Sequence, residues 1–297
     1  VTLGGRVDHY EAIDELRFSP RLGLGYRLRD GLTWTASYGA YYQQPYFIFL
    51  ATFPENRVLD PWRADHLITG IAWQPAPSWR LTLEGYRKDY DDYPVATEYP
   101  SLSLANIGDT FNVRETLFPL TSAGDGYSQG VELFVEKGAT EGGGIGGLYG
   151  QANLSFSKTR HAGLDGILRP GAFDYPVIFN LTTGYRLSRA WELSTRVSWL
   201  SGRPYTPFDE EISTEQRRAV YDLDQVNALR APDYFRLDIR VDRTFLVGGE
   251  PLVIFGGVQN VTNRRNFAGY QWNRRTNTQQ FSEQQGIFPI LGLEWRF

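Results

Sequence analysis

Apolar and polar residues alternate with a period of two in one segment of the chain after another. In the clearest segment, residues 235–242, four apolar residues alternate with four charged ones: Phe235, Leu237, Ile239 and Val241 against Arg236, Asp238, Arg240 and Asp242. Successive side chains of a β-strand point to opposite faces, so this strand would have one apolar face and one charged face. The same alternation recurs from Trp191 to Trp199 and from Val131 to Glu136. The pattern predicts strands that separate two different environments.

Alternating segments bounded by Gly, Pro, Asp and Ser predict about twelve strands, each of roughly 10 to 16 residues, where soluble strands usually have about 5 or 6. The predicted strands are Val1 to Tyr10, Arg17 to Leu28, Leu32 to Gln44, Arg63 to Gln74, Trp79 to Tyr93, Tyr127 to Lys137, Leu148 to His161, Tyr175 to Leu187, Trp191 to Gly202, Tyr234 to Phe245, Leu252 to Thr262 and Ile287 to Phe297. The predicted fold class is all-β and antiparallel.

Short and long connections alternate between these strands. The short ones are Arg29 to Gly31, Pro75 to Ser78, Gly138 to Gly147, Ser188 to Ala190 and Val247 to Pro251. The long ones are Glu11 to Leu16, Pro45 to Trp62, Pro94 to Gly126, Ala162 to Asp174, Arg203 to Asp233 and Asn263 to Gly286. Transmembrane barrels have short periplasmic turns and long external loops, whereas a soluble half-exposed sheet alternates in polarity without placing its long loops at one end. The loops therefore favour a transmembrane β-barrel.

In such a barrel the apolar strand faces contact lipid and the charged faces line the lumen. We expect the lumenal arginines to pair with carboxylates on neighbouring strands, as Arg236, Asp238, Arg240 and Asp242 could. Rings near strand ends predict two aromatic girdles at the membrane interfaces. These rings are Tyr41, Tyr42, Trp62, Trp73, Trp79, Tyr90, Tyr93, Trp191, Trp199 and Trp295.

Composition agrees with this fold and removes several function classes. Aromatic residues make up 15% of the 297 residues, which favours strands and interfacial rings. The absence of Cys excludes disulfides and thiolate chemistry, and a net charge of −4 without a dense basic cluster argues against nucleic-acid binding. No apolar run reaches the about 20 residues of a membrane-spanning helix.

Candidate catalytic and metal-binding residues are few. The three histidines, His9, His66 and His161, are scattered, and none lies beside a recognisable serine motif. Asp60 and Asp65 near His66 are interpreted as a solvated cluster rather than a metal site. We therefore expect no enzymatic activity, no metal and no cofactor.

Several segments together resemble the carboxy-terminal barrel of TonB-dependent outer-membrane receptors. They are GGRVDHY, SPRLGLGYRLRDGLTWTASYGAYYQQP, SGRPYTPFD at Ser201 to Asp209, YFRLDIRVDRTF, VQNVTNRRNF at Val258 to Phe267, and the final LGLEWRF. Each motif is loose, but their order over most of the chain is specific. The resemblance implies a segment, residues 1–297, of a barrel of about 22 strands in the outer membrane of a Gram-negative bacterium.

The resemblance also implies parts that this sequence does not contain. At about 25 residues per strand and loop, such a barrel needs roughly 550 residues for its wall, and an amino-terminal plug fills the lumen. The chain has no Met and no signal peptide. We therefore expect a fragment without the plug and first strands, and energised transport would need the TonB complex acting through the missing part. The strands would form an open half-barrel or close as a smaller barrel.

The resemblance implies import of a scarce nutrient, most often a ferric siderophore, and contact with the barrel assembly machinery through the last strand. The ligand-contact candidates are rings and arginines of the long loops: Tyr46, Phe47, Phe49, Arg57, Tyr205, Tyr221, Tyr270, Trp272, Arg274 and Arg275. The candidate assembly signal is the alternating set Leu291, Leu293, Trp295 and Phe297. Two alternatives stay open, namely a complete small barrel acting as a channel or enzyme, and a soluble all-β binding module.

Overall fold

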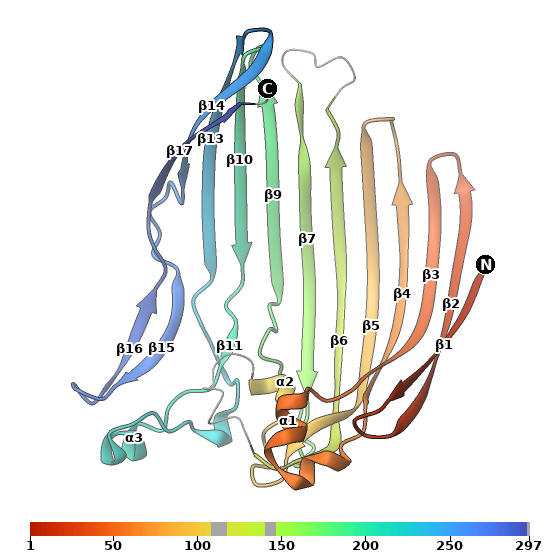
Figure 1. The fold of residues 1–297 in the computed structure, drawn as a ribbon, viewed down its shortest axis with the longest axis vertical. Helices are drawn as coiled ribbons and strands as arrows, with labels where there is room; N and C mark the ends of the chain where they lie inside the picture. The colour runs from red at the N-terminus through yellow and green to blue at the C-terminus, as the bar shows by residue number, and fades with distance from the viewer. Residues whose placement is uncertain (108–117, 140–146, 296–297) are drawn as a thin grey trace.

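The computed structural model describes residues 1–107, 118–139 and 147–295. Its main element is one curved antiparallel sheet in which almost every strand pairs with its neighbours in the sequence (Figure 1). The strands, in spatial order, are β1 (Thr2–Tyr10), β2 (Glu15–Arg29), β3 (Leu32–Gln43), β4 (Trp62–Trp73), β5 (Trp79–Ala96), β6 (Leu120–Lys137), β7 (Leu148–His161), β9 (Val177–Arg186), β10 (Trp191–Leu200), β13 (Tyr234–Val247), β14 (Glu250–Gln259) and β17 (Phe288–Trp295). Each corresponds to one predicted strand.

The remaining elements lie in the long connections, which gather at one end of the sheet, while the short turns lie at the other (Figure 1). They are α1 (Phe47–Thr52), η1 (Pro54–Val58), α2 (Leu104–Ile107), β8 (Arg169–Pro170), β11 (Pro204–Tyr205), α3 (Glu210–Gln216), η2 (Leu223–Gln225), β12 (Leu229–Arg230), β15 (Phe267–Asn273) and β16 (Thr278–Glu283). None of the helices in the described residues is long and apolar enough to cross a membrane.

Three predicted connections differ from the structure. Glu11 to Leu16 was predicted as a long loop, but it is a tight turn that ends at Asp14, whose φ of 52° completes the reversal. The predicted loop Pro94 to Gly126 is shortened because β5 and β6 continue to pair inside it as far as Ala96 and Leu120, after register shifts between Tyr90 and Pro94. Its residues 108–117, like residues 140–146 of the predicted turn Gly138 to Gly147, lie outside the described part of the chain.

The third difference is the predicted loop Asn263 to Gly286, which contains the hairpin β15–β16. Its strands are short and rich in Gln, Asn and Gly, so polarity hid the strand pattern.

The sheet is open, which agrees with the expected half-barrel and not with the smaller closed barrel. Each edge strand has one partner, β1 pairing with β2 and β17 with β14, and the two do not pair with each other in the described residues. In Figure 1 they lie at opposite sides of the sheet. Closure into a small barrel is therefore not what this chain adopts.

The register fixes which residues share a face, because residues directly opposite one another in antiparallel strands point to the same side. Arg240 lies opposite Ser194, and Asp238 lies opposite Arg196, so the charged face of β13 continues across β10. The other face carries Leu237 opposite Val197 and is apolar. We call these two sides the polar face and the apolar face. The predicted separation of environments is thus present in the wall.

The two arginines of β13 pair differently from the prediction, which was wrong about their partners, whereas Arg186 of β9 pairs as predicted with Glu192 of the neighbouring strand β10, at 3.5 Å. Arg236 Nε donates to Asp238 Oδ1 at 2.7 Å, and Arg240 pairs in the same way with Asp242. Both pairs lie along one strand, two residues apart, instead of across two strands. The reason is geometric, since side chains two apart share a face and a long arginine reaches its neighbour without crossing the sheet.

The predicted rings divide between the two faces. By register, Trp73, Trp79, Trp191 and Trp295 lie on the apolar face at the short-turn end, and Tyr42 and Trp199 lie on it at the other end. Tyr41, Trp62 and Tyr90 lie on the polar face instead. Trp62 stacks 5.3 Å from Tyr93, which lies 5.3 Å from His161. Tyr93 belongs with the polar-face rings through these contacts. The predicted girdle rings Tyr41, Trp62, Tyr90 and Tyr93 were therefore misassigned, because strand position alone does not reveal the face.

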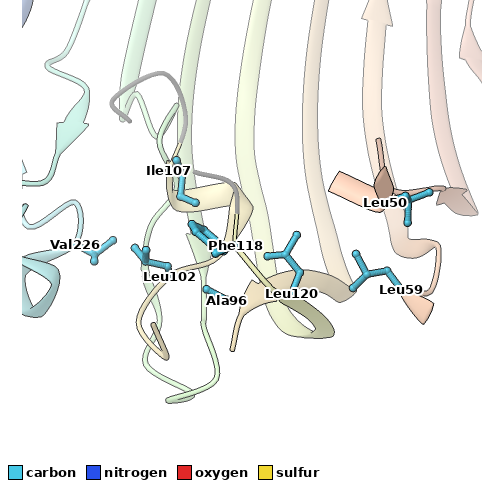
Figure 2. Packing of buried hydrophobic residues seen from close by; sticks show 8 residues of the cluster. All are labelled: Leu50, Leu59, Ala96, Leu102, Ile107, Phe118, Leu120 and Val226. Carbon is cyan, nitrogen blue, oxygen red and sulfur yellow. The ribbon is translucent and has the colours of Figure 1, made fainter. Parts of the chain in front are cut away.

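The long connections have a hydrophobic core of their own, separate from the sheet faces. Figure 2 shows its eight buried residues, which come from three connections and the ends of β5 and β6: Leu50, Leu59, Ala96, Leu102, Ile107, Phe118, Leu120 and Val226. Asn56, 1% exposed, donates to the carbonyls of Phe49 and Phe118 and accepts from the amide of Leu120. The loops are thus held in place as a packed unit.

Candidate ligand-binding site

The structure brings four of the ten loop candidates together around a ring that the sequence reasoning missed. Phe208 lies 4.9 Å from Tyr221, 5.0 Å from Tyr270 and 6.0 Å from Trp272, measured between ring centroids. Tyr205 completes the group at 4.5 Å from Tyr270. We call these five residues the ring cluster. Edge-on contacts at these separations are favourable for aromatic pairs, so the ring cluster joins two connections that are distant in sequence.

The centre of the ring cluster is Tyr270 on the hairpin β15–β16. Its hydroxyl donates to the carbonyl of Thr206, next to Tyr205. Burial raises the pKa of the Tyr270 hydroxyl above its ordinary value, and the nearby Tyr221 and Tyr205 raise it further. Tyr270 is therefore a neutral donor, and its contacts hold the hairpin against the loop that begins at β11.

The other six loop candidates do not join the ring cluster. Tyr46 stands before α1, 6.0 Å from Trp62, and Phe49 packs against the loop core. Phe47 is exposed, and so are Arg57 in η1 and both Arg274 and Arg275 at the tip of the hairpin. The role of these six residues as ligand contacts stays a prediction. Four of them lie in the connection between β3 and β4, and two lie between β15 and β16.

A cavity of about 500 Å³ lies on the polar face at the long-loop end. Strands β9, β10 and β13 supply its floor, and the segment around β15 supplies one side. Its principal lining residues are Tyr175, Asn180, Arg196, Arg203, Tyr234 and Phe267. None of them was among the predicted ligand contacts. The signal for Arg196 was nevertheless present, because the alternation from Trp191 to Trp199 placed it on the charged face.

Contacts beside the cavity attach the hairpin segment to the start of β13. Asp233, just before β13, accepts from Arg264 at 2.8 Å and from the indole of Trp199 at 2.9 Å. The hydrogen bonds from Arg264 and Trp199 lower the pKa of the Asp233 carboxyl. Asn266 bonds both the amide and the carbonyl of Phe235, which attaches the start of the hairpin segment to β13.

A buried carboxylate anchors the opposite side of the same region. Asp174 is 1% exposed and pairs with Arg160 at 2.8 Å and with Arg230, while its second oxygen accepts from the amide of Thr159. Arg230 also donates to the carbonyl of Gly202 at 2.9 Å. Because a buried carboxylate needs such partners, Asp174 ties β7 and two long connections together.

Two further cavities lie at opposite ends of the sheet. A second cavity of about 220 Å³ adjoins the first through Tyr234 and Gln284, and it adds Arg236 to the lining. The cavity of about 640 Å³ at the short-turn end, beside Trp79 and Glu136, contains none of the predicted ligand contacts. The long-loop end therefore combines cavities, guanidinium groups and rings.

The histidines are not arranged for metal binding. In residues 1–107, 118–139 and 147–295 no group of three or more His, Asp or Glu side chains could hold a metal ion. His161 lies in the ring stack with Tyr90 at 5.2 Å, and Asp60 pairs with Arg17 at 2.9 Å instead of with His66. The cavities are suited to holding an anionic ligand through arginines and phenols.

The predicted assembly residues lie as expected where they are described. Leu291, Leu293 and Trp295 are on the apolar face of β17 and exposed, with Leu291 at 84%. Phe297 lies outside the described residues. Their role as a signal stays a prediction.

Comparisons with known proteins give the same architecture. Residues 1–261 match the family model described as TonB dependent receptor-like, beta-barrel. The outer membrane transporter YddB from Escherichia coli superposes with a TM-score of 0.70 at 14% identity, covering 99% of this chain and 43% of that one. The ferripyoverdine receptor of Pseudomonas aeruginosa, bound to ferripyoverdine, gives 0.68 at 15% identity, covering 99% and 36%.

The FrpB iron transporter from Neisseria meningitidis gives a TM-score of 0.64 at 15% identity, covering 94% of this chain and 39% of that one. The chain thus spans between 36% and 43% of the length of these three structures. No curated protein sequence matches it. At such low identity the solved structures establish the fold, and the family model establishes the relationship.

Proposed function

The chain belongs to the TonB-dependent receptor-like β-barrel family, and from this premise we propose that it supplies part of the wall and the ligand site of a receptor that imports a ferric siderophore. The family consists of transporters and receptors of the Gram-negative outer membrane and not of enzymes, so the expected location and the expected lack of enzymatic activity hold. The enzyme and the soluble binding module are accordingly set aside.

From family membership we infer the roles of the two faces and of the two ends of the sheet. The apolar face contacts lipid, and the polar face lines the lumen. The short turns lie on the periplasmic side and the long connections on the outside. The cavity beside Arg196 and Arg203 therefore opens into the lumen near its external mouth, where an arriving ligand first meets the wall.

The observation that carries the proposal is the combination of this cavity with the ring cluster. Arg196 and Arg203 bring two guanidinium groups to a cavity that Tyr175, Tyr234 and Phe267 also line. Guanidinium groups bind carboxylate and phenolate oxygens bidentately, and aromatic faces accept flat or cationic groups. Ferric chelates of catecholate or hydroxycarboxylate type present such oxygens around the metal. The iron is cargo, and the side chains of this chain would contact the organic chelator that surrounds it.

The two open edges of the sheet indicate which partners the chain needs. An open sheet cannot persist in lipid, because the backbone groups of β1 and β17 would lack partners there. We therefore propose that further strands complete a barrel of about 22 strands, with this chain as its carboxy-terminal portion. The energising TonB complex would act through a plug in the lumen. The exposed Leu291, Leu293 and Trp295 of β17 would meet the barrel assembly machinery.

The test uses the full-length receptor that contains this chain. Binding of a panel of ferric catecholates, hydroxamates and citrates is measured by fluorescence quenching, and uptake by iron-limited growth. We expect one class to bind, and Arg196→Gln or Arg203→Gln to weaken that class about 10- to 100-fold, the effect of losing a charged hydrogen bond of ~1.5–3 kcal/mol.

Arg27→Gln is the matched control, because Arg27 lies on the polar face of β2, opposite Thr33, and far along the sheet from the cavity. It should leave binding unchanged. If no ferric chelate binds, or if Arg27→Gln weakens binding as much as the cavity variants, the proposed ligand class or site is wrong.

A further inference from the structure

Two tryptophans on the lipid face each lie directly opposite a cation of the next strand. Trp191, the first residue of β10, is opposite Arg243, and Trp79, the first residue of β5, is opposite Lys137. The cations stand over the rings, Arg243 Cζ at 5.0 Å from the Trp191 centroid and Lys137 Nζ at 5.7 Å from that of Trp79. The wall thus repeats one arrangement at two places on its short-turn rim.

Local structure fixes the height of both rings. Trp191 follows the turn at Ser188, whose hydroxyl accepts from the Trp191 amide at 3.1 Å, and Trp79 donates its amide to the carbonyl of Ala76 at 3.0 Å. Each ring is therefore held at the last level of the wall before the periplasm. Its own strand continues with apolar residues on the same face, Leu193 after Trp191 and Leu81 after Trp79. Both rings are about two-fifths exposed.

Arg243 and Lys137 differ from the lumenal arginines because no carboxylate side chain pairs with them. Within the part of the chain that the structure describes, neither Arg243 nor Lys137 takes part in an ion pair. Arg186 at the same rim faces the lumen, stands 5.8 Å from the Tyr149 ring and pairs with Glu192 at 3.5 Å. Arg243 instead stands over a second ring, Phe245, with its Cζ 4.5 Å from the ring centroid, and Arg243 is exposed. Each lipid-side pair therefore presents a net positive charge.

A tryptophan at this level lies at the boundary between acyl chains and headgroups, where indole rings are enriched. A cation beside it extends to the headgroup layer while its stem covers apolar surface. The complementary group at that height is a lipid phosphate, which a guanidinium can bind bidentately.

From this geometry we propose that Trp191–Arg243 and Trp79–Lys137 are two binding sites for anionic phospholipid headgroups, of the phosphatidylglycerol class, in the periplasmic leaflet. The excess positive charge selects an anionic lipid over a zwitterionic one. Exposed Arg189, in the turn before Trp191, adds a further positive charge near the first site. The inference depends on the membrane location and orientation of the wall, and not on the identity of the imported ligand.

The experiment titrates the detergent-solubilised full-length receptor with phosphatidylglycerol, and in a parallel arm with phosphatidylcholine, and counts bound lipids by native mass spectrometry. We expect Arg243→Gln and Lys137→Gln each to weaken phosphatidylglycerol binding at its own site about fivefold, the effect of one cation near an anionic membrane surface. The double variant should lose the preference for phosphatidylglycerol over phosphatidylcholine.

Arg186→Gln is the matched control, since it removes a cation beside a ring at the same rim but on the lumenal face. It should keep the full preference. Folding of every variant is checked by the heat-dependent mobility of the barrel, and Arg243→Lys and Lys137→Arg serve as charge-preserving variants that should keep the sites. A double Gln variant with undiminished preference, or an equal loss in Arg186→Gln, would overturn the proposal.

Discussion

Asn227 donates its side-chain amide to the backbone carbonyl of Asn106 at 2.7 Å, which connects two long loops 121 residues apart in the sequence. The same nitrogen donates to the carbonyl of Pro170 at 2.9 Å, so one side chain bonds three connections. Asn227 is 1% exposed and has a φ of 54°, a left-handed conformation that asparagine tolerates better than most residues. Asn227 is therefore one buried point, beside the loop core, at which three of the long loops are joined.

Asn227→Ala should loosen the loop unit. The substitution leaves the carbonyls of Asn106 and Pro170 without this donor. It also puts alanine, which has no polar side chain to bond locally, at a positive φ. The two effects together should cost roughly 1–3 kcal/mol. Limited proteolysis between residues 203 and 233 should accelerate while the barrel melts as before. Asn227→Gly removes the amide without the backbone strain, so its effect isolates the hydrogen bonds. Unchanged proteolysis in both variants would show that Asn227 does not hold the loops.

Ile239→Arg tests the assignment of the lipid face. Ile239 lies opposite Thr195 and Val258 on the apolar face of β13, and an arginine there should destabilise the receptor in lipid vesicles by about 2–4 kcal/mol if it is near the bilayer midplane. Ser194→Arg, on the lumenal face of β10 opposite Arg240, is the control and should have a much smaller effect. Urea titrations measure both. Equal small losses would mean that the faces are assigned wrongly.

Asp233, which lines a neighbouring cavity of about 250 Å³ together with Arg264, predicts a pH dependence of stability. Hydrogen bonds from Arg264 and Trp199 lower its folded pKa below the unfolded value of about 4. Its stabilising contribution is therefore complete above that unfolded value and is lost as the pH falls through the lowered folded pKa. Melting temperatures between pH 2 and 5 should fall less steeply in Asp233→Asn than in the parent. Identical slopes would contradict the role of this carboxylate.

Tyr270 allows the ring cluster to be tested apart from the guanidinium groups. Tyr270→Phe keeps the ring and loses the hydroxyl bond to Thr206, whereas Tyr270→Ala also removes the contacts to Tyr205 and Phe208. If the ring cluster supports the ligand site, the Ala variant should bind its ferric chelate about tenfold more weakly, a loss of ~1.4 kcal/mol. The Phe variant should bind nearly normally. Parent-like binding by the Ala variant would separate the ring cluster from the site.

The strands were predictable because their signal is local. The alternation from Phe235 to Asp242 depends on neighbouring residues alone, and it identified both β13 and its two faces. Family resemblance added the outer-membrane location. The turn at Asp14 and the extension of β5 past Tyr93 were missed because a positive φ and a bulge leave little trace in hydrophobic periodicity.

The site was less predictable because it depends on residues that are distant in the sequence. Phe208 reaches Tyr270 only after the hairpin β15–β16 folds back, and the hairpin itself looked like a polar loop. Arg196 was placed on the charged face, yet nothing local indicated that a cavity would lie beside it. Arg203 stood within a recognised motif, SGRPYTPFD, whose resemblance indicated a strand end and not a contact.

The Arg–Asp pairs that run along single strands have a consequence for biogenesis. Arg236–Asp238 and Arg240–Asp242 on β13, like Arg6–Asp8 on β1, are each within one short peptide segment, so forming them closes almost no loop. A newly arriving strand can therefore neutralise these lumenal charges before it meets its neighbour. The neutralisation of these three arginines therefore does not depend on the order in which the neighbouring strands are inserted.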